Sequence, residues 1–340
     1  MSSILKHQFT EFRSGRDLGP DDAEEFLDAL INDTDEALLA NVFRAWNEKG
    51  IAEDEIYSVA KILRSRMKAI HSRHELFVDI VGTGGSQAKT FNVSTAASFV
   101  VAGTGIAVAK HGNKAATSNT GSTDVLSELG IDPTVGPDVA EMCLNEIGIA
   151  FMFAPNFHRL SQTLAKVRRG LGFPTIFNCV GPLCNPASAP HQLIGVWNKE
   201  LVTKMANALA RLGTKRSWIV HGDDGLDEIS INGRTMVVEV EGRTVREFTI
   251  EPEHFGIAPP DLRDLRSNDA VHSGKTIRNV LIGKPDSSAA KDIVLVNAAA
   301  AIHIATENSD LKASMTVAAE AVNVGKALRK LEELASAIPV

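Results

Sequence analysis

The segment Asp79-Ile-Val-Gly-Thr-Gly-Gly-Ser86 joins a short apolar run to a cluster of glycines. Residues 77–81 predict a buried strand, and the glycines after it let the backbone come close to a ligand. A second segment, Phe91-Asn-Val-Ser-Thr-Ala96, opens a predicted helix with small polar residues. Free N–H groups at the start of a helix bind anions. The two segments together therefore predict an anion-binding loop.

A second small-polar loop follows further along the chain. Lys110-His-Gly-Asn-Lys114 and Thr117-Ser-Asn-Thr-Gly-Ser122 lead into another predicted helix. Two such loops close in sequence predict a ligand that carries phosphate at both ends. Neither loop fits the G-x-G-x-x-G or G-x-x-x-x-G-K-[ST] pattern of common nucleotide sites. Taken alone, the glycine loop fits a tight turn equally well, but three polar loops that follow apolar strands favour a ligand site.

The composition is typical of a soluble metabolic enzyme. The chain has 340 residues, of which 44% are hydrophobic, so we expect a large core and two domains. A formal charge of −7 argues against nucleic-acid binding and against attachment to anionic membranes. We expect no apolar run near the roughly 20 residues that span a bilayer, and no signal peptide. Cys143, Cys179 and Cys184 lack metal-ligand spacing, which favours reduced thiols in a cytoplasmic protein.

The pattern of apolar residues changes near residue 75. Before it, helical spacing predicts three helices, at residues 20–31, 34–48 and 52–72. After it, short apolar strands alternate with helical patterns, which indicates a mainly parallel sheet. These strands are expected at residues 106–109, 147–152, 193–196 and 218–221.

The segment from Asp227 to Ile250 has a different pattern. Glycine-centred turns at Asn232-Gly233 and Glu241-Gly-Arg243 separate runs of β-branched residues, which predicts an antiparallel meander. The predicted fold class is α/β: a small N-terminal helical domain, and a larger α/β domain with a central mainly parallel sheet and an antiparallel portion. An irregular surface loop is expected at residues 258–269, where two prolines stand together.

The motifs resemble one enzyme family. Residues 79–129 are similar to the anthranilate phosphoribosyltransferase family, whose signature reads GTGGD…TFNxST…KHGNRxxSS…G. The likeness extends over essentially the whole chain, and continues in Phe151–His158, Val167–Arg169, Thr175–Pro186, Val220–Glu228 and Val296–Ala301. The resemblance implies a helical domain at residues 1–75, joined by helices near 160–185, and an α/β domain at residues 76–340 that binds phosphoribosyl pyrophosphate (PRPP).

The resemblance also implies an activity. Such an enzyme transfers the 5-phosphoribosyl group of PRPP to the amine of anthranilate, giving N-(5-phosphoribosyl)anthranilate and pyrophosphate. This is the second step of tryptophan biosynthesis from chorismate, and it uses Mg²⁺. Such chemistry needs positioning and electrostatics rather than a covalent nucleophile, and the sequence has no G-x-S-x-G motif. A cytoplasmic homodimer is expected from the same resemblance.

Three groups of site residues are carried over from the family motifs. Those expected to bind PRPP are Gly82, Gly85, Ser86, Thr90, Asn92, Val93, Ser94, Thr95, Lys110, His111, Gly112, Asn113, Lys114, Ala115, Ala116, Thr117, Ser118 and Ser122. Those expected around anthranilate are Gly82, His111, Asn113, Pro155, His158 and Arg168, with the guanidinium pairing with the carboxylate. The expected Mg²⁺ ligands are Ser94, Asp227 and Glu228.

Each of the less specific assignments has a simpler alternative. Asp227 and Glu228 could be ordinary surface charges, because acidic residues are mostly exposed. However, two adjacent carboxylates repel unless a cation lies between them. Arg168 could be a helix-surface arginine, since it lies beside Lys166 and Arg169. The remaining alternative concerns a histidine, His158, which could be a packed ring or a helix cap.

Several positions depart from the family signature, among them Asn119, Thr120 and Thr123 in the second phosphate loop. Ser86 stands where the family carries Asp after GTGG, which removes a charge that would help to hold metal or ribose. Lys114 replaces the usual Arg and keeps the charge without the planar guanidinium. Because the loops are otherwise intact, we predict an active enzyme with altered metal dependence or weaker PRPP affinity.

Two other functions are compatible with the same fold. One is a pyrimidine nucleoside phosphorylase or a phosphoribosyltransferase for another acceptor, but Asn113 and Arg168 suit an acceptor that carries a carboxylate. The other is a non-catalytic nucleic-acid-binding relative. Such a protein should be basic, because phosphate neutralisation dominates its affinity, whereas this chain is acidic.

Overall fold

Four helices precede the first strand in the computed structural model, which describes residues 2–86, 90–113, 121–258, 265, 267, 269–306 and 310–340. They are α1 (Ser2–Arg13), α2 (Ala23–Asn32), α3 (Glu36–Lys49) and α4 (Glu53–Arg66). The last three correspond to the predicted helices with shifted ends. α1 was not predicted. The helix expected to reach Ser72 ends earlier, because the backbone is already extended at Met67.

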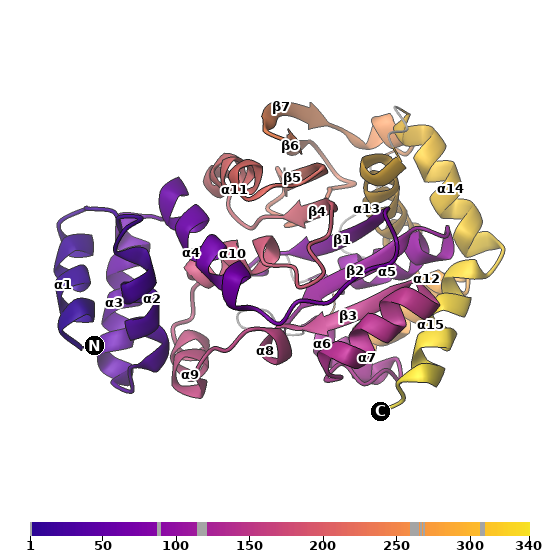
Figure 1. Ribbon diagram of the computed structural model, residues 1–340. Coiled ribbons are helices and arrows are strands. Elements are labelled where there is room, and N and C mark those ends of the chain that lie inside the picture. Colours follow the sequence, from indigo (N-terminus) through magenta and orange to yellow (C-terminus); the bar gives the residue numbers. More distant parts are fainter. Residues whose placement is uncertain are drawn as a thin grey trace.

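A seven-stranded sheet follows, in the order β3-β2-β1-β4-β5-β6-β7 (Figure 1). Its parallel strands are β1 (Phe77–Gly82), β2 (Ala107–Gly112), β3 (Ile149–Phe153), β4 (His191–Gly195) and β5 (Arg216–Gly222). β6 (Thr235–Glu241) and β7 (Thr244–Ile250) are antiparallel to their neighbours. The α/β class with an antiparallel portion is thus confirmed. Asn232-Gly233 lies before β6, so only the Glu241–Arg243 turn joins two strands of the predicted meander.

Helices cover both faces of the sheet. The helices after β1 are α5 (Val93–Gly103), α6 (Ser122–Glu128), α7 (Pro137–Met142), α8 (Ala154–Phe157), α9 (Gln162–Gly170), α10 (Ile176–Leu183), α11 (Lys199–Leu212), α12 (Ala270–Leu281), α13 (Ser288–Thr306), α14 (Leu311–Asn323) and α15 (Lys326–Ala337), with a π-helix at Cys143–Ile147 and a 3₁₀-helix at Pro252–Phe255. One buried apolar cluster packs α5 and α13 against the sheet. A second cluster joins α1–α4 to α9–α11 and the opposite face. In Figure 1, α9 accordingly lies beside the N-terminal helices.

α13 corrects one expectation from the sequence. Over Ser288–Thr306 its mean hydropathy is 1.3, so by length and composition it is the one described helix that could cross a membrane. However, 83% of this stretch is buried inside the protein, as in a core helix. The expectation that no apolar run approaches membrane-spanning length was therefore wrong, although burial accounts for the apolar surface.

The sheet topology has a switch point between β1 and β4. β2 and β3 are added on one side of β1, whereas β4 and β5 are added on the other. At such a switch point, ligands bind outside the carboxyl ends of the strands. The register pairs Gly82 with Gly195 at this edge. Most of the irregular loop expected at residues 258–269 lies outside the described residues.

Candidate active site

The glycine loop is held rigidly at the end of β1. The Thr83 N–H donates to the Gly195 carbonyl at 2.9 Å, and the Thr83 hydroxyl accepts the Trp197 N–H at 3.1 Å. Gly85 has a φ of +94°, and a Cβ there would lie 2.8 Å from Cγ of Pro174. Only glycine fits this combination of positive φ and close contact. The loop is therefore fixed by β4 and the segment before α10.

The acidic segment lies directly over the same edge. A Cβ at Gly195 would lie 1.7 Å from the Asp227 carbonyl oxygen, and a Cβ at Gly82 would lie 3.1 Å from Asp227 Oδ2. The glycines at the ends of two neighbouring strands thus leave room for Asp227. Ser86 links the glycine loop to the acidic turn, because its hydroxyl donates a hydrogen bond to the Gly225 carbonyl at 3.0 Å. The glycine loop and the acidic turn therefore form one structural unit.

Asp227 and Glu228 are partly exposed, and both have raised pKa values. Burial raises the pKa of Glu228 to about 8, and the neighbouring charge of Asp227 adds to the rise. A backbone hydrogen bond from Ser94 opposes it. Ser94 also accepts a hydrogen bond from Lys110 Nζ at 3.2 Å. Two carboxylates, one hydroxyl and a buried ammonium thus meet at the start of α5.

This donor set fits Mg²⁺. Within the described ranges, no group of three or more His, Cys, Asp and Glu residues could hold a metal by itself. Mg²⁺ is usually bound through one or two carboxylates together with substrate phosphates. Asp227 and Glu228 provide two carboxylates that repel each other, and a cation between them would relieve that repulsion. Asn297 of α13 fixes the next residue, since its amide bonds the N–H of Ile229 at 2.9 Å and its C=O at 3.1 Å.

The start of α5 is less open than the sequence suggested. Asn92 is locked by Ser273, whose hydroxyl accepts the Asn92 N–H at 3.0 Å and donates to its Oδ1 at 2.9 Å. Val93 and Thr95 are fully buried; the Val93 side chain belongs to the core, and the Thr95 hydroxyl has no hydrogen-bond partner within the described residues. The Val93 and Thr95 N–H groups are bonded to Phe91 and Asn92 carbonyls. Contacts of Asn92, Val93 and Thr95 with PRPP stay predictions, as does that of Thr90, which lies partly buried just before them.

The second predicted loop is described only at its two ends. Gly112 ends β2, and a Cβ there would lie 2.5 Å from the Ser122 hydroxyl. Ser122 in turn is 3.5 Å from the carbonyl oxygen of Asn113, which is exposed. The structure thus brings Gly112, Asn113 and Ser122 together. Five predicted residues lie outside the described ranges, namely Lys114, Ala115, Ala116, Thr117 and Ser118.

Two histidines lie against the carboxyl end of α10. His111 Nδ1 is 3.1 Å from the Gly181 carbonyl oxygen, and His158 is hydrogen-bonded to the Cys184 backbone. The two ring centroids are 5.1 Å apart. Burial lowers the pKa of His111 to about 3 and that of His158 to about 4. Both rings are therefore neutral near pH 7.

Arg168 differs from its neighbours in the last turn of α9. Burial lowers its pKa to about 10, and its guanidinium carbon lies 4.7 Å from the centre of the Phe177 ring. It forms no ion pair with any residue that the structure describes. Lys166, by contrast, pairs with Glu36 at 2.6 Å, and Arg169 is exposed. The surface-arginine alternative thus describes Arg169 rather than Arg168.

The described geometry divides the predicted residues into two groups. The glycine loop, Ser94, Lys110, Asp227 and Glu228 surround the carboxyl ends of β1, β2 and β4. His111, His158 and Arg168 contact α10, while Pro155 opens the short helix α8. The residues predicted to bind PRPP and Mg²⁺ thus lie largely apart from those predicted around anthranilate.

Sequence comparisons identify the family. The glycosyl transferase family, a/b domain, matches residues 74–328. The anthranilate phosphoribosyltransferase of Moorella thermoacetica is 40% identical over 97% of both chains. The corresponding protein of Rhodopirellula baltica is 41% identical over 96% of this chain and 95% of its own length. This chain belongs to the anthranilate phosphoribosyltransferase family.

Solved structures of anthranilate phosphoribosyltransferases have the same fold. The Thermus thermophilus protein superposes with a TM-score of 0.87 at 34% identity, covering 97% of this chain and 98% of its own. The Saccharomyces cerevisiae protein, in complex with PRPP and Mg, gives 0.88 at 29% identity over 98% of each chain. The resemblance inferred from the sequence motifs is thus confirmed along the whole chain.

Sequence reasoning did not single out several residues that build this site. Thr83, Asn297 and Ser273 fix the glycine loop, the acidic segment and Asn92, respectively. Asp79, quoted only as part of a motif, is a buried carboxylate bonded to the backbone of His111. Their partners lie far away in sequence, so neither spacing nor periodicity could have identified them. The one usable signal was Asp79 itself, a charged residue within an apolar strand.

Proposed function

We propose that this chain transfers the 5-phosphoribosyl group of PRPP to the amine of anthranilate, with Mg²⁺ as cofactor. The observation that supports anthranilate as the acceptor is the environment of Arg168. Its guanidinium is largely buried and has no carboxylate partner among the described residues. A buried cation without a counter-charge is costly. The carboxylate of anthranilate would supply that charge in the bidentate geometry that arginine favours.

The reaction exchanges one bond at ribose C1 for another. The amine nitrogen forms a bond to C1 while the C1–oxygen bond to pyrophosphate breaks. The electron pair of that bond leaves with pyrophosphate, and the nitrogen releases one proton. Positive charge builds on the ribose during this step, so the protein must bind the pyrophosphate and place no unpaired cation beside C1.

The chain's own residues meet both requirements. The glycine loop presents backbone at the switch point of the sheet. Lys110 lies beside Ser94; burial lowers the pKa of its amine, and the nearby carboxylates of Asp79, Glu228 and Asp227 oppose that shift. His111 and His158 stay neutral because burial lowers both pKa values, so they line the acceptor side without adding charge. Bound Mg²⁺ would neutralise charge that develops on the leaving pyrophosphate. Asp227, Glu228 and Ser94 are the residues that would hold it.

The proposal includes the wider organisation of the enzyme. Residues 1–75, with helices near 160–185, form one domain, and residues 76–340 form the PRPP-binding domain. Anthranilate would then lie between them, because Arg168 belongs to α9 and His111 to β2. Closure of such a cleft would exclude water, a competing nucleophile. A cytoplasmic homodimer completes the proposal.

The test is the loss of anthranilate fluorescence on mixing with PRPP and Mg²⁺. We expect the wild-type protein to consume anthranilate, and Arg168→Ala to raise the KM for anthranilate at least about 100-fold, the loss of a charged hydrogen-bonded pair. Arg169→Ala is the matched control, because it removes an exposed arginine from the same helical turn. Its KM should change less than about twofold. Equal effects of both variants would refute the assignment of the acceptor site.

A transferase for another acceptor is the remaining alternative. It predicts that PRPP and Mg²⁺ bind while anthranilate is not consumed. A pyrimidine acceptor has no carboxylate to pair with Arg168, so that alternative leaves the buried guanidinium unexplained. Calorimetry with PRPP alone, run beside the fluorescence assay, separates a wrong acceptor from an inactive protein.

A further inference from the structure

A fully buried carboxylate lies beneath the active site. Asp79 is in the middle of β1, and its exposed fraction is 0%. Burial raises its pKa to about 6, and this effect outweighs the charge of Lys110 and three hydrogen bonds that favour the ionised form. A buried charge is retained at a cost to stability. Such a residue needs a reason beyond the strand in which it lies.

The hydrogen-bond donors around Asp79 come from distant segments. The Asn185 amide donates to Oδ2 at 2.7 Å, and the Gln192 amide is 3.5 Å from the same oxygen. The backbone N–H of His111 donates to Oδ1 at 3.2 Å. Lys110 Nζ instead bonds the Ile80 carbonyl and Ser94. Within the described residues, Asp79 is thus held by uncharged donors.

These donors connect the carboxylate to both sides of the acceptor site. Asn185 also donates to the Ala109 carbonyl at 2.8 Å, which ties the segment after α10 to β2. Gln192 donates to the Pro182 carbonyl in α10 at 3.0 Å. The ring of His111 then contacts α10 through Gly181. One carboxylate therefore fixes the backbone of His111 and, through Asn185 and Gln192, the end of the helix against which that ring packs.

We propose that Asp79 is a positioning residue for the acceptor: its carboxylate sets where His111 and the end of α10 lie relative to each other. This inference rests on the proposed function for the identity of the acceptor. Asp79 does not contact substrate, because no part of it is exposed. The PRPP side should depend on Asp79 less, since the hydrogen bonds of Lys110 go to Ile80 and Ser94 and the charge of Asp79 acts on this amine only through space.

The test is Asp79→Asn. An asparagine has one acceptor oxygen and one donor amide, so either His111 N–H or the Asn185 amide loses its acceptor. We expect the KM for anthranilate to rise about tenfold, whereas the KM for PRPP at saturating Mg²⁺ stays within about twofold of wild type. Amide hydrogen exchange at His111 should become at least about tenfold faster, the loss of one hydrogen bond.

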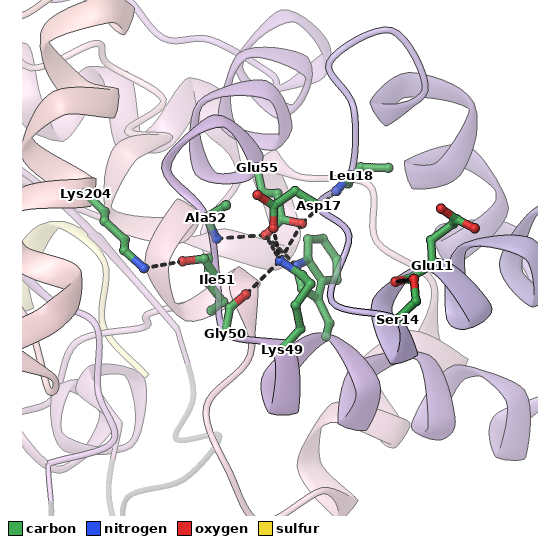
Figure 2. Close-up of polar contacts among 11 residues, drawn as sticks. Glu11, Ser14, Asp17, Leu18, Lys49, Gly50, Ile51, Ala52, Glu55 and Lys204 are labelled. Carbon is green, nitrogen blue, oxygen red and sulfur yellow. Dashed lines mark hydrogen bonds and ion pairs between the residues drawn. The ribbon is translucent and has the colours of Figure 1, made fainter.

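Glu55→Gln provides the matched control. Glu55 also has an exposed fraction of 0%, and it accepts hydrogen bonds from Leu18, Trp46 and Ala52 in the N-terminal helices (Figure 2). The same carboxylate-to-amide change there should lower the melting temperature. It should leave both KM values, and the exchange rate at His111, within about twofold of wild type.

Every outcome bears on the proposal. An unchanged anthranilate KM in Asp79→Asn, or equal rises in both KM values, would overturn it. If that variant does not fold, Asn185→Ala must show the same selective rise, by about threefold for one lost hydrogen bond, and its absence has the same meaning. If wild type does not consume anthranilate, the proposed function fails. Exchange at His111 then still decides whether Asp79 positions this segment.

Discussion

Glu55 and Asp79, the two carboxylates that are fully buried in the described part of the chain, lie in regions with different tasks. Glu55 stands at the start of α4 and accepts the Leu18 and Ala52 N–H groups at 2.9 and 2.8 Å and the Trp46 indole at 2.8 Å. It also pairs with the buried ammonium of Lys49 at 3.1 Å (Figure 2). Its charge is therefore compensated within the helical region.

Asp79 has a similar number of donors but lacks a directly bonded cation in the described part of the chain. Its pKa is raised to about 6, so its charge is retained against a cost. The comparison teaches that burial alone does not indicate a role. A compensated carboxylate such as Glu55 stabilises the fold, whereas we assign the undercompensated Asp79, bonded to the backbone of His111, to a site.

The largest effect in this comparison is expected in the helical region. Glu55→Ala leaves the Leu18, Trp46 and Ala52 donors without their acceptor, whereas Lys49 keeps its contacts with Asp17 and the Gly50 carbonyl. At about 1–3 kcal/mol for each unsatisfied buried donor, the free energy of unfolding should fall by at least about 3 kcal/mol. Urea denaturation measures this loss, and activity per folded molecule should remain. A selective rise in the anthranilate KM would show that Glu55 also acts on the site.

A second effect is expected at the sheet edge. Glu228→Gln should lower kcat about 100-fold, because one of two carboxylates for Mg²⁺ is neutralised while the fold persists. Steady-state kinetics over a range of Mg²⁺ concentrations provide the measurement. Asp223→Asn, an exposed carboxylate 3.5 Å from Lys199, is the control and should change kcat less than about twofold. Equal losses in the two variants would contradict the magnesium assignment.

The smallest effect concerns the pH dependence of stability. His158 has a folded-state pKa of about 4, below its ordinary value near 6.5. The unfolded chain therefore binds a proton between pH 6.5 and 4 that the folded chain does not, and stability falls as the pH decreases. From pH 7 to pH 5 this histidine should account for roughly 2 kcal/mol of lost stability. Urea denaturation at a series of pH values gives the free energy of unfolding as a function of pH. His158→Asn should remove this histidine's part of that dependence, and an unchanged dependence would indicate that His158 is protonated in the folded protein.

Much of the fold could be predicted from local pattern. Apolar runs and glycine turns marked the strands, and the switch from helical to strand periodicity appeared near residue 75. α1 was not predicted because it has few apolar residues and no acidic residue in its first turn to mark the start of a helix. The length and hydropathy of α13 were not predicted, because Asp292, Asn297 and His303 interrupt its apolar pattern.

The site could be predicted where its residues follow one another in the chain. The glycine loop, the Lys110-His111 pair and the Asp227-Glu228 pair are all short motifs. Tertiary packing decided the rest. Val93 and Thr95 are fully buried, which the polar motif around them did not indicate. Asp79 depends on Asn185 and Gln192, more than a hundred positions further along the chain, and no local pattern encodes such a contact.

The most direct test of the central claim, that the substrates bind at the switch point between β1 and β4, is a diffraction experiment with PRPP and Mn²⁺. Mn²⁺ prefers the same oxygen ligands as Mg²⁺ and can be located by its anomalous signal. We predict a peak within bonding distance of Asp227 or Glu228, with pyrophosphate density over the loop from Gly82 to Gly85. A metal bound elsewhere, or PRPP density away from this edge of the sheet, would contradict the account.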